Sequence, residues 1–377
     1  MRILVLNYEF PPVGGGGGRV AKDICYSLAQ RGHDIRIITA YAKGLPKIES
    51  NNGYQILRIF SFRQRQETCT VWEMAFFLVF ALYPAFKQAI IWKPDVIHAH
   101  FAVPTGVLAY LVNRVTHIPY VLTIHLGDVP GGVPEQTDRL FRIIKPLTVP
   151  IWRRAAAIIA VSNFIRELAL KAYNVTIETL FNGIDLNKYQ QNALPVNHPK
   201  RLVFVGRFDR QKNLLFLLEV LASLSDLEWE LDMLGDGPLM QPVQQQLKQT
   251  NLTKKVKLHG WVEQVTVDTI ISQADILVLP SISEGMPVVG AMALAQGLAI
   301  LGSDIGGLTD IVKSGINGLL CPVNNHNAFK NALKTLLTND ELLHDMKIAS
   351  KQYALQFNIT KIIERYEEIF YSVKLPS

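Results

Sequence analysis

The fold of this chain is decided by the stretch Leu202-Val203-Phe204-Val205-Gly206-Arg207-Phe208-Asp209-Arg210-Gln211-Lys212-Asn213. Its first four residues are a short apolar run of the kind that forms a buried strand, and the leucine-rich stretch 214–224 that follows has the pattern of a helix. A strand, a tight loop and a helix are the first half of a βαβ unit. Such runs alternate along most of the chain, so the sequence predicts an α/β protein with parallel sheets.

Two series of strands are expected, one on each side of a polar stretch, 190–200, that contains Pro195 and Pro199 and that we interpret as a linker. The first series comprises 3–7, 35–39, 56–59, 96–99, 120–124 and 157–161. The second comprises 202–205, 230–234, 256–258, 276–279, 299–301 and 318–320. A chain of 377 residues suits two domains of roughly 100 to 200 residues each. We place an N-terminal lobe at 1–188, a C-terminal lobe at 198–358 and a last helix, 359–377, that packs back on the first lobe.

Composition restricts the classes of protein to which the chain can belong. Apolar residues make up 49% and charged residues 19%, which fits a soluble globular protein and excludes a largely disordered one. The net charge is +6 but the basic residues are scattered, so no nucleic acid partner is expected, and a mild positive field suits nucleotide diphosphates or an anionic membrane surface. The three cysteines, Cys25, Cys69 and Cys321, have neither metal-like spacing nor an even count, which favours a cytoplasmic location.

One stretch departs from the alternation of strands and helices. Residues 74–86 are apolar throughout, and Trp72 and Trp92 flank them. This stretch is too short to span a bilayer, which needs about 20 residues. Two interpretations stay open: a buried core helix, or an interfacial surface at 72–92 that docks on the inner face of a membrane or receives a lipid-linked acceptor.

The first strand leads through Pro11-Pro12-Val13 into five glycines, Gly14 to Gly18, ahead of a helix expected to start near Arg19. Glycines let the backbone approach a ligand closely and a helix start offers N–H groups to an anion, so this loop is a candidate phosphate site. The alternative is a flexible turn. Gly16-x-Gly18-x-x-Ala21 also matches the dinucleotide fingerprint, but the second strand ends in Thr39-Ala40-Tyr41 without the acidic residue that would hold a ribose. An NAD-dependent oxidoreductase is therefore poorly supported.

A second candidate site follows two strands of the C-terminal lobe. Arg207 and Lys212 come directly after the strand 202–205, where ligands bind in open α/β sheets, and their charges can neutralise a diphosphate. Glu284 follows the strand 276–279 and precedes a helix expected to begin at Pro287. The plain alternatives are two surface cations and a carboxylate that caps a helix. If a diphosphate binds nearby, Glu284 should face sugar hydroxyls instead, because like charges repel.

Histidines supply a third group of candidates. His125 follows the strand 120–124, and it is either a contact for a transferred sugar or a structural side chain. His98 and His100 alternate along a strand end, but no third metal ligand is evident. The sequence also lacks Asp-x-Asp, Gly-x-Ser-x-Gly and the P-loop pattern, so no metal site, serine hydrolase or P-loop NTPase is expected.

Several short motifs, in order along nearly the whole chain, give a specific resemblance. They are Tyr8-Glu9-Phe10-Pro11-Pro12 with the glycines, Arg31-Gly32-His33, Pro94-Asp95-Val96-Ile97-His98-Ala99-His100, Asn182-Gly183-Ile184-Asp185, Val205-Gly206-Arg207-Phe208 with Lys212, Leu234-Gly235-Asp236-Gly237-Pro238, Ser283-Glu284-Gly285, and Gly306-Gly307 followed by Asn317-Gly318-Leu319-Leu320. The chain resembles the family-four retaining glycosyltransferases of the GT-B fold, which has two Rossmann-like lobes with parallel sheets facing across a cleft.

The resemblance implies transfer of a hexose-type sugar from a nucleotide-diphosphate sugar, with retained configuration, to a hydroxyl of a glycan, a lipid-linked acceptor or a small molecule. Cell-surface polysaccharide or glycoconjugate synthesis is the expected setting, and no metal or other cofactor is expected. It places the donor in the C-terminal lobe and the acceptor mainly on the N-terminal lobe. GT-B epimerases and phosphorylases are disfavoured, because the motifs follow the transferase order.

The resemblance also assigns roles to residues of this chain. Arg207 and Lys212 match residues that hold the diphosphate, which the loop Gly14, Gly15 and Gly16 approaches from the other lobe. The expected catalytic residues are His125, near the reacting carbon, and Glu284, which contacts the donor sugar. Around them, the sugar and ribose contacts are expected at Gly285, Met286, Pro287 and Gly290, and the base contacts at Gly260, Trp261 and Val262.

One departure from the family pattern bears on activity. A second glutamate, which holds the ribose diol, is expected eight residues after Glu284, where Met292 stands. Alignment on Ala291-Met292-Ala293 puts Gly290 there instead. In both registers the carboxylate is absent. The alternative function is therefore a weakly active or inactive nucleotide-sugar-binding protein of the same fold.

Overall fold

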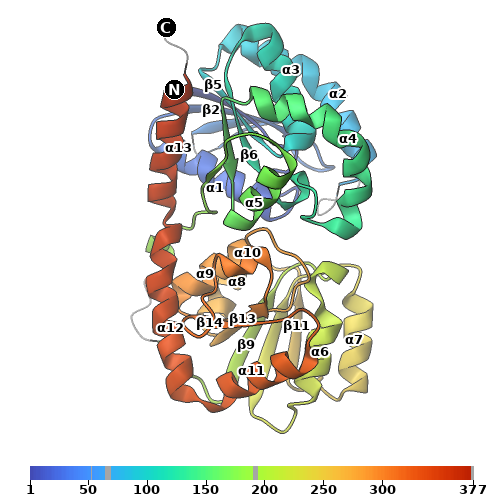
Figure 1. The fold of residues 1–377 in the computed structure, drawn as a ribbon, viewed down its shortest axis with the longest axis vertical. Helices are drawn as coiled ribbons and strands as arrows, with labels where there is room; N and C mark the ends of the chain where they lie inside the picture. The colour runs from blue at the N-terminus through green and yellow to red at the C-terminus, as the bar shows by residue number, and fades with distance from the viewer. Residues whose placement is uncertain (52, 64–68, 190–193, 375–377) are drawn as a thin grey trace. The chain divides into compact units, whose positions relative to one another are not determined.

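The computed structural model describes residues 1–51, 53–63, 69–189 and 194–374. The chain forms two compact units, Met1–Gly183 with Ile359–Ser377, and Ile184–Asn358 (Figure 1). Each unit is built on one sheet of mainly parallel strands, so the expected α/β fold class is confirmed. Part of the expected linker, residues 190–193, lies outside the described residues. Residues 184–188, which we expected in the first lobe, belong to the second unit by their contacts.

The first unit contains a sheet with the strand order β3-β4-β2-β1-β5-β6-β7-β8. Its strands are β1 (Arg2–Leu6), β2 (Asp34–Ala40), β3 (Ile48–Asn51), β4 (Tyr54–Ile59), β5 (Val96–His100), β6 (Tyr120–Ile124), β7 (Ala157–Ala160) and β8 (Glu178–Thr179). Its helices are α1 (Gly16–Gln30), α2 (Val71–Lys87), α3 (Val107–Thr116), α4 (Pro134–Arg154), α5 (Asn163–Ala172) and α13 (Ile359–Val373), with short helical turns η1 (Gln88–Trp92), η2 (Ala102–Gly106) and η3 (Leu126–Asp128).

Helices cover both faces of this sheet, which explains why its strands are continuous apolar runs. Leu4 and Leu6 of β1 belong to the core under α2, α3 and α4, while α1 and α13 lie on the opposite face (Figure 1). The last helix is tied to the first unit by polar contacts. Glu367 of α13 accepts from Arg31 Nε at 2.8 Å and lies 2.7 Å from His33 Nε2.

Two strands and one helix start differ from the sequence-based expectation. β3, which reads Ile48-Glu49-Ser50-Asn51, pairs antiparallel with β4 at the sheet edge. Because three of its four residues are polar, it has no apolar run from which a strand could be predicted. β8 has only two residues. The first helix begins at Gly16 and not near Arg19, because glycines of the run form its first turn.

The apolar stretch forms a longer helix than expected. α2 continues through the π-helical turn η1 to Trp92, and this 22-residue helix is long and apolar enough to cross a membrane by length and composition alone. The argument that the stretch is too short was therefore wrong. Phe77, Ala81 and Ala85, at a spacing of four residues, are buried against the sheet, as the core-helix interpretation requires.

The second unit contains a parallel sheet with the order β11-β10-β9-β12-β13-β14. Its strands are β9 (Lys200–Val205), β10 (Trp229–Leu234), β11 (Val256–Gly260), β12 (Ile276–Leu279), β13 (Ala299–Ser303) and β14 (Gly318–Cys321). Its helices are α6 (Leu214–Ala222), α7 (Met240–Gln249), α8 (Gln264–Ser272), α9 (Val288–Gln296), α10 (Gly306–Thr309), α11 (His326–Thr338) and α12 (Asp340–Ala354), with turns η4 (Leu186–Tyr189), η5 (Arg210–Lys212) and η6 (Leu355–Phe357). All six strands of the second expected series form.

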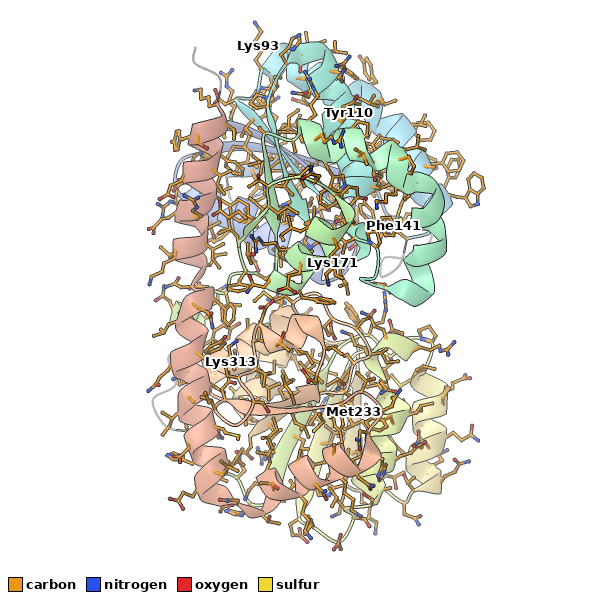
Figure 2. The ribbon with its side chains drawn as sticks, in the orientation of Figure 1. Lys93, Tyr110, Phe141, Lys171, Met233 and Lys313 are labelled. Carbon is orange, nitrogen blue, oxygen red and sulfur yellow. The ribbon has the colours of Figure 1, made fainter. Side chains whose placement is uncertain are left out.

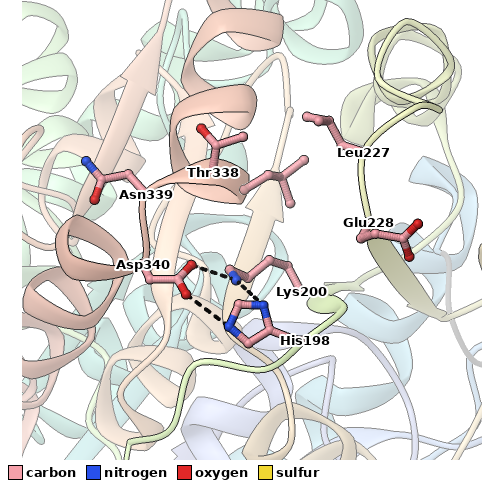
Figure 3. Close-up of a pocket in the computed structure, with 8 residues that line it drawn as sticks. His198, Lys200, Leu227, Glu228, Thr338, Asn339 and Asp340 are labelled. Carbon is pink, nitrogen blue, oxygen red and sulfur yellow. Dashed lines mark hydrogen bonds and ion pairs between the residues drawn. The ribbon is translucent and has the colours of Figure 1, made fainter.

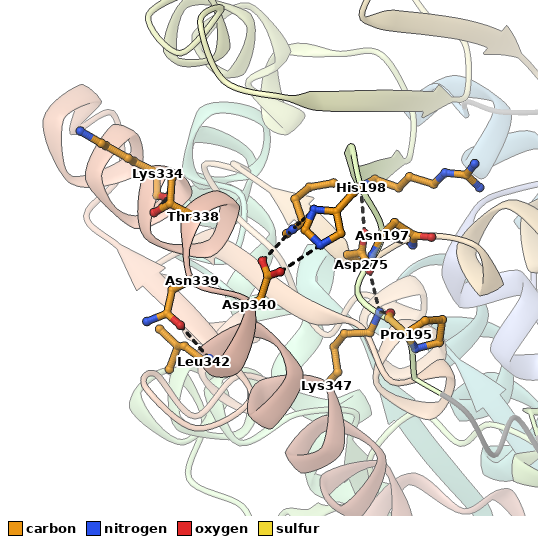
Figure 4. Close-up of polar contacts among 12 residues, drawn as sticks. Pro195, Asn197, His198, Asp275, Lys334, Thr338, Asn339, Asp340, Leu342 and Lys347 are labelled. Carbon is orange, nitrogen blue, oxygen red and sulfur yellow. Dashed lines mark hydrogen bonds and ion pairs between the residues drawn. The ribbon is translucent and has the colours of Figure 1, made fainter.

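A buried carboxylate, Asp275, joins three parts of the second unit at the amino end of β12. It accepts from Lys347 Nζ of α12 at 2.7 Å, from the backbone N–H of Arg201 at 2.9 Å and from the side chain of Asn197 at 3.1 Å (Figure 4). Both charged side chains are almost fully buried. A buried charge is tolerated only when it is paired and hydrogen-bonded, and here both conditions hold.

Replacement of Lys347 by Met should destabilise the second unit by about 3 kcal/mol or more, because Asp275 would stay buried without its cation. The measurement is urea unfolding followed by hydrogen exchange of unit-specific amides, since the two units need not unfold together. The exposed Lys334→Met serves as the control and should change stability by less than about 0.5 kcal/mol. Equal effects of the two substitutions would contradict this account of Asp275.

Candidate functional site

The candidate site of the second unit lies where β9 and β12 end. These strands are neighbours in the sheet, so the loops that follow them meet at its carboxyl edge. The two loops are joined directly: Ile282 donates its N–H to Gln211 O, and Gln211 Nε2 donates to Ser283 O, both at 2.8 Å. Residues about 70 positions apart in sequence are thereby held in one small structure.

Lys212 and Glu284 form a mostly buried ion pair. Lys212 Nζ lies 2.5 Å from Glu284 Oε1, and Ser281 Oγ donates to the same oxygen at 2.7 Å. Glu284 is not a helix cap, because Pro287 is the N-cap of α9 and no side chain caps it. The carboxylate is instead fixed by one cation and one hydroxyl, both of which engage the same oxygen.

Arg207 is positioned by a neighbouring carboxylate, Asp209. Arg207 Nε donates to Asp209 Oδ2 at 2.5 Å, while Asp209 Oδ1 accepts the backbone N–H of Lys212 at 3.2 Å and caps the turn η5. The guanidinium is partly exposed. Its terminal nitrogens are further donors in a planar fork that suits phosphate oxygens. The structure therefore brings Arg207, Lys212 and Glu284 into one region, as the sequence predicted.

Sequence reasoning missed Asp209 and Ser281. The sequence held a signal for Ser281, because Ser281-x-x-Glu284 has the spacing at which a hydroxyl and a carboxylate meet in a tight turn. It held no such signal for Asp209, since an aspartate two residues after an arginine is common in loops.

In the first unit the glycine loop has both open and closely packed positions. An added Cβ at Gly15 or Gly16 would meet no atom within 4 Å, so these residues border open space. An added Cβ at Gly17 would lie 2.7 Å from the Phe101 ring, and one at Gly18 would lie 2.6 Å from Glu9 O. Gly17 and Gly18 thus need glycine for close packing, as does Gly14, whose added Cβ would lie 2.5 Å from Glu9 Cβ, and Gly15 and Gly16 are accessible to a ligand.

His125 lies beside this loop in a cluster of buried rings. The position of a Gly17 Cβ is 3.4 Å from the imidazole, whose Nε2 is 3.4 Å from His100 Nδ1. His98 Nε2 is bonded to Thr123 Oγ1 at 2.8 Å, and both His98 and His100 are fully buried. Burial lowers the pKa of His125 to about 4 and that of His98 to about 3, so both rings are neutral at pH 7. Among the described residues, no group of three potential ligands could hold a metal ion.

Asp128, which sequence reasoning did not single out, orients this cluster. Its carboxylate accepts the backbone N–H groups of His125 at 2.8 Å and Ala102 at 2.7 Å. Burial raises its pKa to about 7, and these N–H groups offset only part of the rise. His125 is thus fixed through its backbone by a carboxyl group 3 residues away.

The predicted base contacts lie at the end of β11 and in the loop before α8, and the predicted sugar and ribose contacts lie in the loop before α9 and on α9 itself. Trp261 is exposed, and Gly260 has a positive φ of 68°. At Gly290 an added Cβ would lie 2.2 Å from Cδ1 of the buried Ile311, so a side chain there would require the tip of that isoleucine to move. Met292 is buried, with Gln264 Nε2 at 4.0 Å from its sulfur. Neither Gly290 nor Met292 supplies a carboxylate, and the same Gln264 Nε2 donates to Asp268 Oδ1 at 2.7 Å.

A separate hollow of about 740 Å³ lies at the other end of the second unit's sheet (Figure 3). Lys200, the first residue of β9, and His198 line it, and both bond Asp340 at 2.8 and 2.9 Å. Lys200 and then His198 hold the pKa of Asp340 below its usual range. Because ligands of parallel sheets bind at carboxyl ends and this hollow lies at an amino end, we assign it no role in the site.

Family models match both units of the chain. Residues 14–188 match the model described as Glycosyltransferase Family 4, and residues 187–353 match Glycosyl transferases group 1. The chain belongs to the family-four glycosyltransferases. The predicted family is confirmed.

Two relatives match most of this glycosyltransferase. N-acetyl-alpha-D-glucosaminyl L-malate synthase of Bacillus anthracis is 26% identical and covers 97% of this chain and 95% of its own length. UDP-Gal:alpha-D-GlcNAc-diphosphoundecaprenol alpha-1,3-galactosyltransferase of Escherichia coli is 28% identical and covers 77% of this chain and 78% of its own length.

Solved structures confirm the fold of the glycosyltransferase as GT-B. Sucrose-phosphate synthase from Thermosynechococcus elongatus superposes with a TM-score of 0.85 over 99% of this chain and 98% of its own, at 19% identity. HepE of Anabaena in complex with UDP-glucose superposes with a TM-score of 0.77 over 99% of this chain and 100% of its own, at 18% identity.

Asp128→Asn should abolish one pH-dependent contribution to the stability of the first unit. A carboxyl whose folded pKa is about 7 and whose ordinary value is 3.8 binds more protons when folded, so stability falls as pH rises through this window. The wild type should lose up to roughly 4 kcal/mol relative to the variant between pH 4 and pH 8.

The measurement is the difference between the two unfolding free energies at several pH values. The buried histidines, whose lowered pKa values act in the opposite direction, are common to both proteins and cancel in that difference. Parallel pH profiles of wild type and variant would refute the assignment.

Proposed function

We propose that this glycosyltransferase moves a hexose-type sugar from a nucleotide-diphosphate sugar to a hydroxyl acceptor, with retained configuration and without a required metal. The observation that carries the proposal is the Lys212–Glu284–Ser281 cluster beside Arg207. A UDP-glucose complex among the solved GT-B structures supports the donor class.

In this mechanism the cations of the second unit act on the leaving group. The bond between the anomeric carbon and the diphosphate breaks, its electron pair leaves with the diphosphate, and Arg207 and Lys212 stabilise the charge. The acceptor hydroxyl forms the new bond from the same face, and its proton passes to the departing phosphate oxygen. Arg207 and Lys212 neutralise the charge that a divalent ion neutralises in metal-dependent transferases, so no cofactor is proposed.

Glu284 acts on the sugar in the same mechanism. Both protein contacts engage Oε1, so Oε2 is left as an acceptor for a sugar hydroxyl. Ser281 is a positioning residue, because it holds the carboxylate when the Lys212 ammonium turns to a phosphate. Lys212 can contact both the donor diphosphate and the Glu284 carboxylate, so it links the diphosphate end of the site to its sugar end.

His125 and the loop Gly14–Gly16 keep the roles that the family resemblance assigns to them. Gly17, the next residue of the loop, packs beside the His125 ring, which supports treating the loop and the imidazole as one element. A neutral imidazole at pH 7 is suited to hydrogen bonding near a reacting carbon and not to charge neutralisation.

The setting we propose is synthesis of a cell-surface polysaccharide or glycoconjugate in the cytoplasm. The Escherichia coli relative, whose name gives a diphosphoundecaprenol acceptor, supports a lipid-linked or glycan acceptor.

A second candidate function rests on the missing carboxylate at Gly290 and Met292. Without a ribose contact of that kind, the protein would bind nucleotide sugars weakly or without transfer. A panel of nucleotide sugars separates the two functions: slow donor hydrolysis without acceptor marks an enzyme, and thermal stabilisation by a donor without turnover of any donor or acceptor marks a binding protein.

Lys212→Ala should lower turnover by about 10²-fold or more, because the leaving diphosphate loses a charge-assisted contact. The measurement is donor hydrolysis and, once an acceptor is found, transfer, with calorimetry for donor binding. The exposed Lys254→Ala is the matched control and should retain wild-type rates. Wild-type turnover of the Lys212→Ala protein would rule out the proposed site.

A further inference from the structure

Helix α2 and the turn η1 expose a large apolar surface on the first unit. We define the α2 apolar face as its exposed side chains together with two from the loop after β4. These are Val71, Trp72, Phe76, Val79, Phe80, Tyr83, Ile90, Ile91, Phe60 and Phe62. Trp72 is 77% exposed and Ile91 70%. Soluble proteins rarely leave so many large apolar side chains together in water, and such a patch marks an interaction site.

The α2 apolar face lies opposite the side by which the helix is anchored. The buried residues Phe77, Ala81, Ala85 and Ala89 form one stripe that packs into the core of the first unit. Trp92 is the last residue of this buried stripe. Figure 2 shows aromatic side chains that stand out from α2 on the side away from the sheet. The helix therefore has two apolar sides, and the buried one holds it in the fold. A span across a bilayer would require the loss of that packing, whereas contact with a membrane surface would not.

Four phenylalanines give the surface a compact aromatic cluster. The Phe62 ring centroid lies 4.6 Å from that of Phe60 and 4.7 Å from that of Phe76, and Phe76 stacks with Phe80 at 6.3 Å. Phe62 has a φ of 55°, a conformation that a bulky residue rarely adopts. The Phe62 ring is 52% exposed although it packs within this cluster.

Exposed basic side chains border the α2 apolar face, and one carboxylate, Asp34, accepts the Nε1–H of Trp92 at the carboxyl end of η1. Lys87 and Lys93 are exposed at the carboxyl end of the helix, and Arg114 is exposed on the neighbouring helix α3. Within the described stretches 60–63, 71–93 and 107–117 the sequence holds one carboxylate, Glu73, which is buried in the capping box at the helix start. An apolar surface bordered by exposed cations is complementary to a layer with anionic head groups over hydrocarbon.

We propose that the α2 apolar face docks the glycosyltransferase on an anionic lipid bilayer. Trp72, Tyr83 and the phenylalanines enter the interfacial region, where amphipathic aromatic rings are favoured. Lys87 and Lys93 contact the lipid phosphates. The inference does not depend on the proposed transfer reaction, because docking needs neither donor nor acceptor.

Vesicle flotation of the full chain tests this proposal directly. The protein should float with vesicles of phosphatidylcholine mixed with phosphatidylglycerol, and much less with phosphatidylcholine alone. Ile91→Asp should lower the partition coefficient about tenfold or more, because one inserted apolar side chain becomes a charge. The matched control is Ile316→Asp, a 61% exposed isoleucine of the second unit, which should float like the wild type.

A second pair of variants tests the cations. Lys87→Gln with Lys93→Gln should weaken binding about fivefold for each lysine, and high salt should have the same effect on the wild type. Lys334→Gln is the control. Val79→Asp, at a 60% exposed position, repeats the apolar test if Ile91→Asp does not fold by circular dichroism.

Three results would overturn the proposal. They are no flotation of the wild type with anionic vesicles, equal flotation of folded Ile91→Asp and wild type, and self-association in light scattering that Ile91→Asp abolishes while vesicles stay unbound. The last result would assign the face to a second copy of the chain. Loss of turnover in Lys212→Ala with normal flotation would show that docking and transfer are separate properties.

Discussion

The ion pair between Lys212 and Glu284 is the interaction on which the second unit's candidate site depends. It exists because β9 and β12 lie side by side, so that the residues after each strand reach the same edge of the sheet. Ser281 and Asp209 then fix the carboxylate and the turn that carries the lysine. A mostly buried carboxylate and ammonium are stable together but costly apart, and a ligand that displaces one partner must replace its contact. Such a site favours ligands that supply an anion and a hydroxyl at the same time.

The pattern of buried strands could be predicted from sequence because helices cover both faces of each parallel sheet. Strands such as β6 and β12 are then uninterrupted apolar runs with clear ends, and the residues after those ends are the site candidates. β3 could not be predicted, because an edge strand makes its hydrogen bonds on one side and needs no apolar pattern. The true length of α2 was also hidden, since a π-helical turn carries the helix past Lys87.

Contacts between distant parts of the chain were the least predictable part of the site. The sequence placed His125 and the glycine loop separately, and only the fold shows Gly17 packed against Phe101 and next to the imidazole. His100 and Asp128 were not assigned to His125, since their effect depends on the register of β5 against β6 and on burial. The absence of a second glutamate could be read from the sequence, whereas the packing of Gly290 against Ile311 could not.

The path of the chain has a consequence for the order of its folding during synthesis. The first unit receives its last helix, α13, from residues 359–373, which a ribosome makes after the entire second unit. Until then the side of the sheet that carries His98, against which Tyr366 and Phe370 pack, stays uncovered. Domains usually fold in the order in which they emerge. Here the unit that emerges first is completed last, so the nascent protein presents unpaired apolar surface for most of its translation.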